Sequence, residues 1–251
     1  MAGLGLRALD DFGAVYEPSD VSDSAAPRPG VVILHGSEGP WAGWAHRFAA
    51  ILAAHGLAAL PLGYGEGDLW GAGPILEVDL RRVHAAGRAL AARLDGGRVG
   101  LLGWSKGAEA ALLAMALAGD DTPFTCIAAH AAPDIVTPAF DPEARRAGRR
   151  WDTASPTDPR AWVWPGEEAA LTPGKAIPAS RIARPVFLSV GTADAVWDPH
   201  MVLRLAERLR GAGNPPDLMV AEGQGHGFDW DTEPQFWARL LGFFSRHLGP
   251  P

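Results

Sequence analysis

The stretch at residues 99–108 reads VGLLGWSKGA, and the rest of the chain is best interpreted outward from it. Its first four residues predict a buried strand, and the Ala- and Leu-rich segment 106–118 predicts a helix. Between them, GWSKG at residues 103–107 matches the pattern G-x-S-x-G in the strand–turn–helix context that makes it informative. The flanking residues are glycines because a Cβ in so sharp a turn would collide with the adjacent strand and helix. We therefore predict that Ser105 is a nucleophile and that the backbone N–H of Lys106 points at the carbonyl oxygen under attack.

Strand and helix signals alternate along the chain on both sides of this stretch. Short apolar runs, most of them ending at glycine, predict further buried strands at residues 31–34, 57–62, 124–129, 186–190 and 218–221. Segments of helical length lie at about 40–55, 75–94, 106–118, 200–211 and 234–248. This alternation predicts an α/β fold with a doubly wound, mostly parallel sheet, in one domain that spans residues 1–251.

The alternation breaks at about residues 133–184, where Pro, Gly, Arg and Trp accumulate. A segment of some fifty residues is too long for an ordinary connection, and its tryptophans (Trp151, Trp162 and Trp164) argue against disorder. We predict an inserted cap that roofs the pocket, with Trp162 and Trp164 as aromatic walls for an apolar or aromatic acyl group. The alternative is that these tryptophans only attach the cap to the core.

A nucleophilic serine needs a base and a group that orients the base. His226 lies in GQGHGF at residues 223–228, directly after a predicted strand and before the last helix. Asp194 comes just past the carboxyl end of another buried strand. Asp198 is the rival acid, although WDP at residues 197–199 is also typical of a helix start in which Asp198 is the N-cap. We predict Asp194 as the acid and His226 as the base.

The loop HGSEGP at residues 35–40 follows an early strand, where a second donor to the oxyanion is expected. The backbone N–H of Ser37 is the preferred donor, with that of Glu38 as the alternative. We interpret His35 as a structural residue of this loop. These pieces all lie at the carboxyl ends of predicted strands, where open α/β sheets place their sites. The residues predicted to contact the substrate are Glu38, Trp104, Trp162, Trp164 and Trp197.

Composition limits the partners. Lys and Arg number 22 against 29 Asp and Glu, a net charge of −7, which disfavours binding to nucleic acid or to an anionic membrane. The basic residues of segment 145–150 are flanked by Asp141, Glu143 and Asp152 and are interpreted as a solvated helical face. The single cysteine, Cys126, is predicted to be a buried, inert thiol. We expect no metal and no organic cofactor, and with no secretory signal or membrane span visible we expect a cytoplasmic protein.

With these residues in place, the chain resembles the α/β-hydrolase superfamily, whose triad order is Ser, Asp, His. Within it, the chain resembles the dienelactone hydrolase group, although those enzymes carry cysteine where this chain has Ser105. It also resembles the catalytic domain of the acyl-CoA thioesterase/bile-acid-CoA:amino-acid N-acyltransferase family. That second resemblance depends on AWVWPG at 161–166, on residues 185–197 and on GHG at 225–227.

These observations predict a serine hydrolase that cleaves a small-molecule ester or thioester through an acyl-enzyme on Ser105. One alternative is an acyltransferase, in which an amine or alcohol replaces water at the same acyl-enzyme. A second is a non-catalytic binding protein on a hydrolase scaffold. The oligomeric state is left open.

Overall fold

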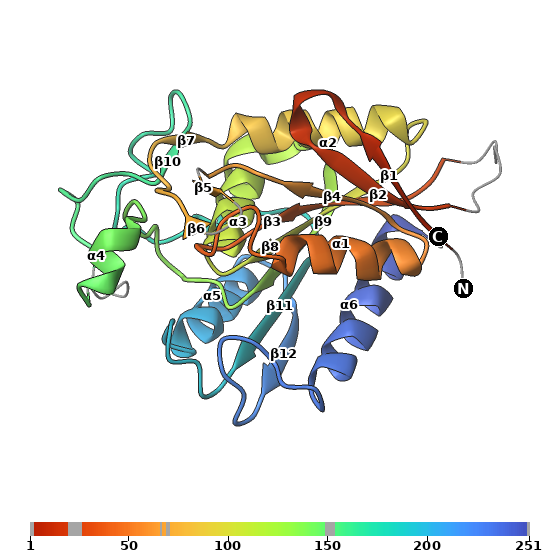
Figure 1. Ribbon diagram of the computed structural model, residues 1–251. Helices are drawn as coiled ribbons and strands as arrows, with labels where there is room; N and C mark the ends of the chain where they lie inside the picture. The colour runs from red at the N-terminus through yellow and green to blue at the C-terminus, as the bar shows by residue number, and fades with distance from the viewer. Residues whose placement is uncertain (1–2, 20–26, 66, 69–70, 149–153, 250–251) are drawn as a thin grey trace.

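The computed structural model describes residues 3–19, 27–65, 67–68, 71–148 and 154–249 (Figure 1). Its centre is an eight-stranded sheet in the order β1-β2-β4-β3-β8-β9-β11-β12. Six consecutive strands of this order, β4-β3-β8-β9-β11-β12, run parallel to one another. Strands β2 and β1 extend the β4 edge in antiparallel pairs. The strands are β1 (Leu4–Ala8), β2 (Ala14–Pro18), β3 (Gly30–Leu34), β4 (Ala58–Leu62), β8 (Val99–Trp104), β9 (Phe124–His130), β11 (Val186–Gly191) and β12 (Asp217–Ala221). The predicted α/β fold with a mostly parallel sheet is confirmed.

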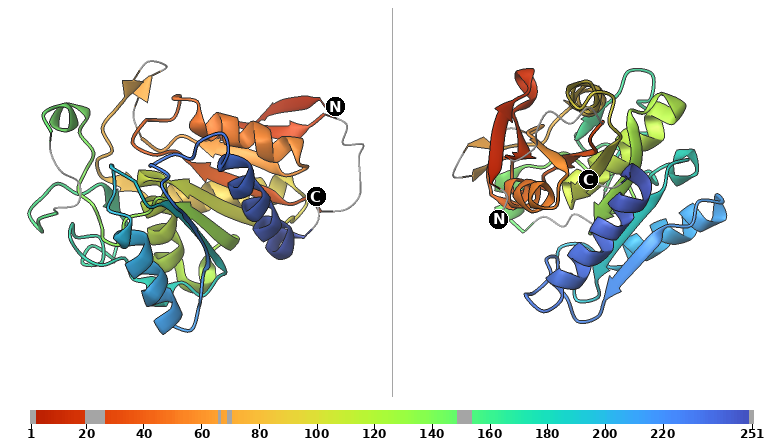
Figure 2. Two further views of the ribbon diagram at one scale, coloured as in Figure 1. Left: turned by 90° about the horizontal axis from the view of Figure 1, so that it is seen from below. Right: turned by 90° about the vertical axis from the view of Figure 1, so that its right-hand side faces the viewer.

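Helices cover both faces of the sheet, as the views in Figure 2 show. One face packs against α1 (Trp44–Ala54) and α6 (Glu233–Leu248), which bury aromatic side chains such as Phe48 and Phe236. The opposite face packs against the helices α2 (Arg81–Arg93), α3 (Lys106–Ala118) and α5 (His200–Gly211). Because both faces are covered, β3, β4 and β8 are buried along their whole length.

The register of the parallel strands brings distant loops to one edge of the sheet. Leu34 at the end of β3 pairs with Gly103 of β8, and Trp104 pairs with His130 at the end of β9. Gly191 at the end of β11 pairs with Ala221 at the end of β12. The loops that follow these strands therefore meet at the carboxyl edge of the sheet, where the predicted site residues lie.

The predicted cap is largely irregular in the described residues. Its short elements are α4 (Pro142–Arg146), β10 (Trp162–Val163) and the 3-10 helix η3 (Ala179–Arg181). Strand β10 pairs in parallel with β7 (Val78–Asp79), and Ile75 forms a bridge with Phe140. The prediction of a helix over 75–94 is therefore wrong at its start, because Ile75 and β7 pair with the cap, Glu77 between them has φ 49°, and α2 begins only at Arg81.

The sequence analysis missed the hairpin of β1 and β2, which adds an edge to the sheet near the N-terminus. The remaining short elements are η1 (Asp10–Phe12), η2 (Gly119–Asp121) and the antiparallel pair β5 (Gly67–Asp68) and β6 (Gly71–Ala72). Trp151, one of the predicted cap tryptophans, lies outside the described residues. Within the described part of the chain, no helix combines the length and the apolar character needed to cross a bilayer.

Candidate active site

Ser105 occupies a strained turn between β8 and α3. Its backbone has φ 54° and ψ −117°, a conformation that costs about 1–3 kcal/mol for a residue other than glycine. The Ser105 N–H donates to the carbonyl of His130 at 2.9 Å, which ties the turn to the next strand. A Cβ at Gly103 would collide with the backbone of Gly107, and one at Gly107 would collide with the carbonyl of Leu34. The two glycines of the motif are thus required by close backbone contacts on both sides of the serine.

Asp194 and His226, which are 32 residues apart in sequence, form a hydrogen bond at this edge. The Nδ1–H of His226 donates to Asp194 Oδ2 at 2.7 Å. Burial by itself would raise the pKa of the Asp194 carboxyl. The bond from His226, and those from the backbone N–H groups of Val196 and Trp197, outweigh burial and hold the pKa below its usual value. Asp194 is therefore ionised and leaves Nε2 of His226 as the ring nitrogen able to accept a proton.

The rival acid, Asp198, lies elsewhere. Its carboxylate accepts hydrogen bonds from the backbone N–H and from Nδ1 of His200, at the first residue of α5, and lies 3.9 Å from Arg204. Those contacts are the ones expected of a residue that caps a helix. The structure thus places Asp194, rather than Asp198, beside His226.

Ser105 and His226 line the same cavity, which has a volume of about 170 Å³. Glu38 and Trp104, two of the residues predicted to contact the substrate, also line it. Trp197, a third, is almost fully buried, and its indole Nε1–H donates to Ser105 Oγ at 3.0 Å. This bond uses a lone pair of the hydroxyl oxygen and leaves the hydroxyl hydrogen free to point toward a base.

A second, water-sized cavity of about 10 Å³ touches Ser105 on the side of the predicted oxyanion donors. Ser37 and Lys106 both line it, together with Phe140 and Trp197. Glu38 is held in the same loop, because its carboxylate accepts a hydrogen bond from the N–H of Gly36 at 2.8 Å. Burial raises the pKa of the Glu38 carboxyl, although that hydrogen bond opposes the effect. The choice between the N–H groups of Ser37 and Glu38 as the second oxyanion donor stays a prediction.

The chain has a strained serine and a histidine–aspartate pair at the carboxyl edge of a parallel sheet, and its sequence matches a known family. A model of the prolyl oligopeptidase family matches residues 79–251, which is more than half of the chain. The chain belongs to the prolyl oligopeptidase family. With the geometry above, family membership makes it a serine hydrolase. No curated protein matches the chain.

Solved structures of several hydrolases share the fold of this family member. A candidate dienelactone hydrolase from Klebsiella pneumoniae subsp. pneumoniae MGH 78578 is 16% identical, with a TM-score of 0.67 over 98% of this chain and 99% of that one. The Pyrococcus furiosus esterase Pf2001 is 17% identical, with a TM-score of 0.64 over 99% and 93%. A puromycin-hydrolysing peptidase from Mycobacterium tuberculosis is 21% identical, with a TM-score of 0.71 over 100% of this chain but 40% of its own. At these identities the similarity shows a common α/β-hydrolase fold.

In this prolyl oligopeptidase family member, Trp162 and Trp164 do not lie where the sequence predicted, as walls of the pocket. Trp162 is 0% exposed, its Nε1–H donates to Glu109 at 2.8 Å, and its ring packs 5.6 Å from that of Tyr64. Trp164 packs edge-on against buried His84 with ring centroids 5.3 Å apart. Neither side chain lines the two cavities beside Ser105. The prediction that they form walls of the pocket is wrong, and the alternative of cap attachment is correct.

Arg145 of α4 is exposed, in keeping with its interpretation as part of a solvated helical face. It also lines both cavities beside Ser105, which the sequence did not indicate. Its Nη1–H donates to Ser37 Oγ at 3.1 Å. Sequence patterns did not reveal this residue, because only the path of the cap brings α4 to the loop after β3.

A buried ion pair lies under the cap at Lys106, next to Ser105. Lys106 Nζ is 3.1 Å from Glu109 Oε2 and donates to the carbonyl of Pro138 at 2.8 Å and to the hydroxyl of Thr137. Glu109 also accepts hydrogen bonds from the N–H of Thr137 and from Trp162. Burial lowers the pKa of the Lys106 ammonium, and the Glu109 charge opposes this. The Lys106 side chain therefore anchors the cap, while the role of its backbone N–H as an oxyanion donor stays a prediction.

Two histidines support the loops of the site. His130, which the sequence analysis missed, bonds to Ser189 Oγ at 2.9 Å and donates from Nε2 to the carbonyl of His226 at 2.9 Å. Burial lowers its pKa to about 3, so it stays neutral and fixes the position of the base. The sequence signal that could have identified His130 is a polar residue at the end of a strand that is otherwise apolar. His35 stacks on Tyr64 with ring centroids 4.0 Å apart and has a pKa of about 4 through burial, in keeping with its predicted structural role.

Among the residues that the structure describes, no three His, Cys, Asp or Glu side chains are grouped so as to hold a metal ion. The single cysteine, Cys126, is buried in β9, and burial raises the pKa of its thiol to about 12. It lies in the sheet as an apolar side chain and takes no part in the cavities beside Ser105.

Proposed function

We propose that the chain is a carboxylic ester hydrolase that works through an acyl-enzyme on Ser105. The observation that carries the proposal is the strained Ser105 turn in one cavity with the His226–Asp194 pair. Further support comes from the fold shared with a dienelactone hydrolase and an esterase over nearly their full lengths. A thioester would react by the same steps, and the experiments below distinguish the two.

The steps balance without any cofactor. Ser105 Oγ bonds to the carbonyl carbon while its proton passes to His226 Nε2, and Asp194 stabilises the imidazolium through the Nδ1–H bond. The negative oxygen then accepts hydrogen bonds from the N–H of Lys106 and from that of Ser37 or Glu38. The bond from carbon to the alcohol oxygen breaks as His226 returns the proton to that oxygen. Water repeats the sequence and releases the acid.

Covalent labelling tests the nucleophile. A fluorophosphonate should label the wild-type chain at Ser105, and Ser105→Ala should remove both the label and the hydrolysis of 4-nitrophenyl acetate. The loss in kcat is expected to reach several orders of magnitude, because the nucleophile, base and acid act as a unit. Activity within tenfold of wild type in a folded Ser105→Ala protein would overturn the assignment of Ser105 as the nucleophile. A wild-type chain that takes no label and hydrolyses no ester would favour a binding protein on a hydrolase scaffold.

The two aspartates provide a matched pair for the acid. Asp194→Asn should lower kcat by about 10⁴ because the imidazole loses the partner that sets its tautomer. Asp198→Asn weakens contacts to His200 and Arg204 and should cost at most about 1 kcal/mol of stability. Steady-state kinetics and urea unfolding of both variants separate these roles, and a reversed result would show that the acid has been misassigned.

The family match favours a second candidate, a peptidase. Parallel assays with an acetyl ester, an acetyl thioester, an aminoacyl anilide and an ester plus an added amine distinguish the reaction types. We expect hydrolysis of the ester to be fastest. Preferred cleavage of the anilide would make the chain a peptidase, and capture of the acyl group by the amine would make it an acyltransferase.

A further inference from the structure

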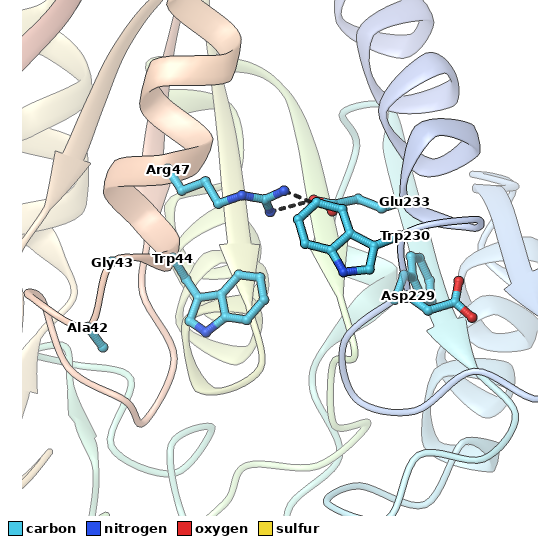
Figure 3. Close-up of a pocket in the computed structure, with 8 residues that line it drawn as sticks. Ala42, Gly43, Trp44, Arg47, Asp229, Trp230 and Glu233 are labelled. Atoms are coloured by element: carbon cyan, nitrogen blue, oxygen red, sulfur yellow. Dashed lines mark hydrogen bonds and ion pairs between the residues drawn. The ribbon is translucent and has the colours of Figure 1, made fainter.

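A second, larger cleft lies next to the proposed catalytic cavity, with a volume of about 450 Å³ (Figure 3). It runs between the start of α1 and the loop that leads from His226 to α6. Trp44 and Arg47 line it from α1, and Phe228, Trp230 and Glu233 line it from the other side. We call it the aromatic cleft.

The aromatic cleft adjoins the catalytic cavity. Trp44 lines both, and its ring stacks on that of Trp104 at 5.5 Å, which in turn lies edge-on to His226 at 6.3 Å. His226 and Gly227 line the catalytic cavity, and the next residue, Phe228, lines the cleft. A group attached to a substrate at Ser105 can therefore extend into the cleft past the base.

The polar side chains of the cleft already have partners. Arg47 and Glu233 form a two-contact ion pair, 2.8 Å from Nη2 to Oε2, and Glu233 also accepts from Trp237 at 3.0 Å. Asp229 accepts from the side chain of Gln224 and from the backbone N–H of Thr232. A ligand rich in hydroxyl groups would find its partners occupied, whereas an apolar ring would meet the exposed faces of indoles.

The exposure of these indoles supports a ligand role. Trp230 is 85% exposed and Trp44 is 40% exposed, although both are large apolar residues. Exposed apolar residues that stand singly need no explanation, but these two line the same concave surface. Two indoles facing one cleft provide the stacking surfaces that a planar ring prefers.

The direction of proton transfer decides which half of the ester enters the cleft. His226 must return its proton to the alcohol oxygen, so the alcohol half lies on the side of His226. The cleft begins at that side, next to Gly227 and Phe228. On the side of Lys106 and Trp197 the adjoining cavity holds only about 10 Å³, which suits a short acyl group.

We propose that the aromatic cleft binds the aromatic ring of the substrate's alcohol half, so that the preferred substrates are short-chain acyl esters of aromatic alcohols. This inference rests on the proposed ester hydrolase function and adds a substrate class to it. Trp230 and Trp44 are its specificity-determining residues.

The kinetic test compares 2-naphthylmethyl acetate with decahydro-2-naphthylmethyl acetate, whose alcohols are both primary and share one carbon skeleton. The wild-type chain should prefer the naphthyl ester, and Trp230→Ala should reduce the ratio of the two kcat/KM values about fivefold, mainly through KM. The matched control is Trp41→Ala, because Trp41 is also exposed, at 53%, but lines a different cavity. Its ratio should equal that of wild type. No preference for the naphthyl ester, or an unchanged ratio in Trp230→Ala, would overturn the inference.

A binding test keeps failure of the cleft distinct from failure of the catalytic proposal. Ser105→Ala cannot form an acyl-enzyme, but it should still bind 2-naphthylmethanol, measured by naphthalene fluorescence, and Ser105→Ala/Trp230→Ala should bind it more weakly. Equal binding by the two proteins overturns the cleft assignment even if the wild-type chain hydrolyses esters. Weaker binding by the double variant upholds the assignment of the cleft to an aromatic alcohol, whatever the result of the labelling experiment.

Discussion

Trp162 in the cap and Trp230 beside the aromatic cleft are both indoles on segments outside the central sheet, yet their surroundings are opposite. Trp162 is fully enclosed and hydrogen-bonded to Glu109, which is itself paired with Lys106 behind the serine. Trp230 lies open to solvent against a cleft that leads to His226. An indole in an irregular segment can therefore attach that segment to the core or present a binding surface, and only its contacts distinguish the two.

The largest effect should come from Trp162. Trp162→Ala removes a fully buried indole and one donor to a buried carboxylate, and should lower the free energy of unfolding by about 3–5 kcal/mol. Urea unfolding measures this loss, and Trp162→Phe should recover most of it by restoring ring volume. Activity should fall equally for short and long acyl esters. A selective loss with long acyl chains at unchanged stability would mean that Trp162 is a wall of the pocket, and would contradict its role in attaching the cap.

The buried histidine that packs against Trp164 should make the stability of the protein sensitive to acid. His84, which packs against Trp164, is 2% exposed, and burial lowers its pKa from 6.5 to about 4, opposed by its bond to the carbonyl of Ala114. Because the unfolded chain takes up this proton near pH 6.5 and the folded chain does not, stability is lost as the pH falls from 6.5 to 4.

His84→Gln keeps a neutral donor and removes this titration. The loss of stability between pH 6.5 and 4 should shrink by about 3 kcal/mol, measured as urea unfolding at several pH values. His35 and His130 are also buried and neutral, so the variant keeps a part of the acid sensitivity. An identical pH dependence in His84→Gln and wild type would show that His84 already binds a proton in the folded state.

The smallest effect should come from Trp230. Trp230→Ala removes a ring that is 85% exposed, so the free energy of unfolding should change by no more than about 0.5 kcal/mol. Thermal and urea unfolding beside Trp162→Ala give the direct contrast. A loss above about 1 kcal/mol would mean that Trp230 supports the fold, and its effect on substrate preference would then need separation from stability.

Local patterns in the sequence were sufficient for the parallel part of the sheet and for the residues at its carboxyl edge, but not for the hairpin of β1 and β2. The central strands lie within two residues of their predicted bounds, because runs of apolar residues ending at glycine are typical of strands buried on both faces. The turn at Ser105 was predictable because its motif is local, although Gly107 is required by the backbone of Leu34 on the neighbouring strand. Asp194 and His226 were predictable in position because the carboxyl ends of parallel strands share one edge, while their catalytic roles stay proposals.

The positions of the irregular segments, by contrast, could be read only from the tertiary structure. Residues 75–79 had a helical pattern, yet they form no helix, because Phe140 and β10 of the cap offer backbone partners that a helix would not use. Arg145 reaches Ser37, and Trp162 reaches Glu109, across long stretches of chain whose path no periodic pattern describes. Periodicity reports which face of a regular element is apolar, and therefore it specifies strands, helices and the turns between them. It carries no information about which distant surface a segment without a period will contact, so the cap, its ion pair and the aromatic cleft depended on the folded chain.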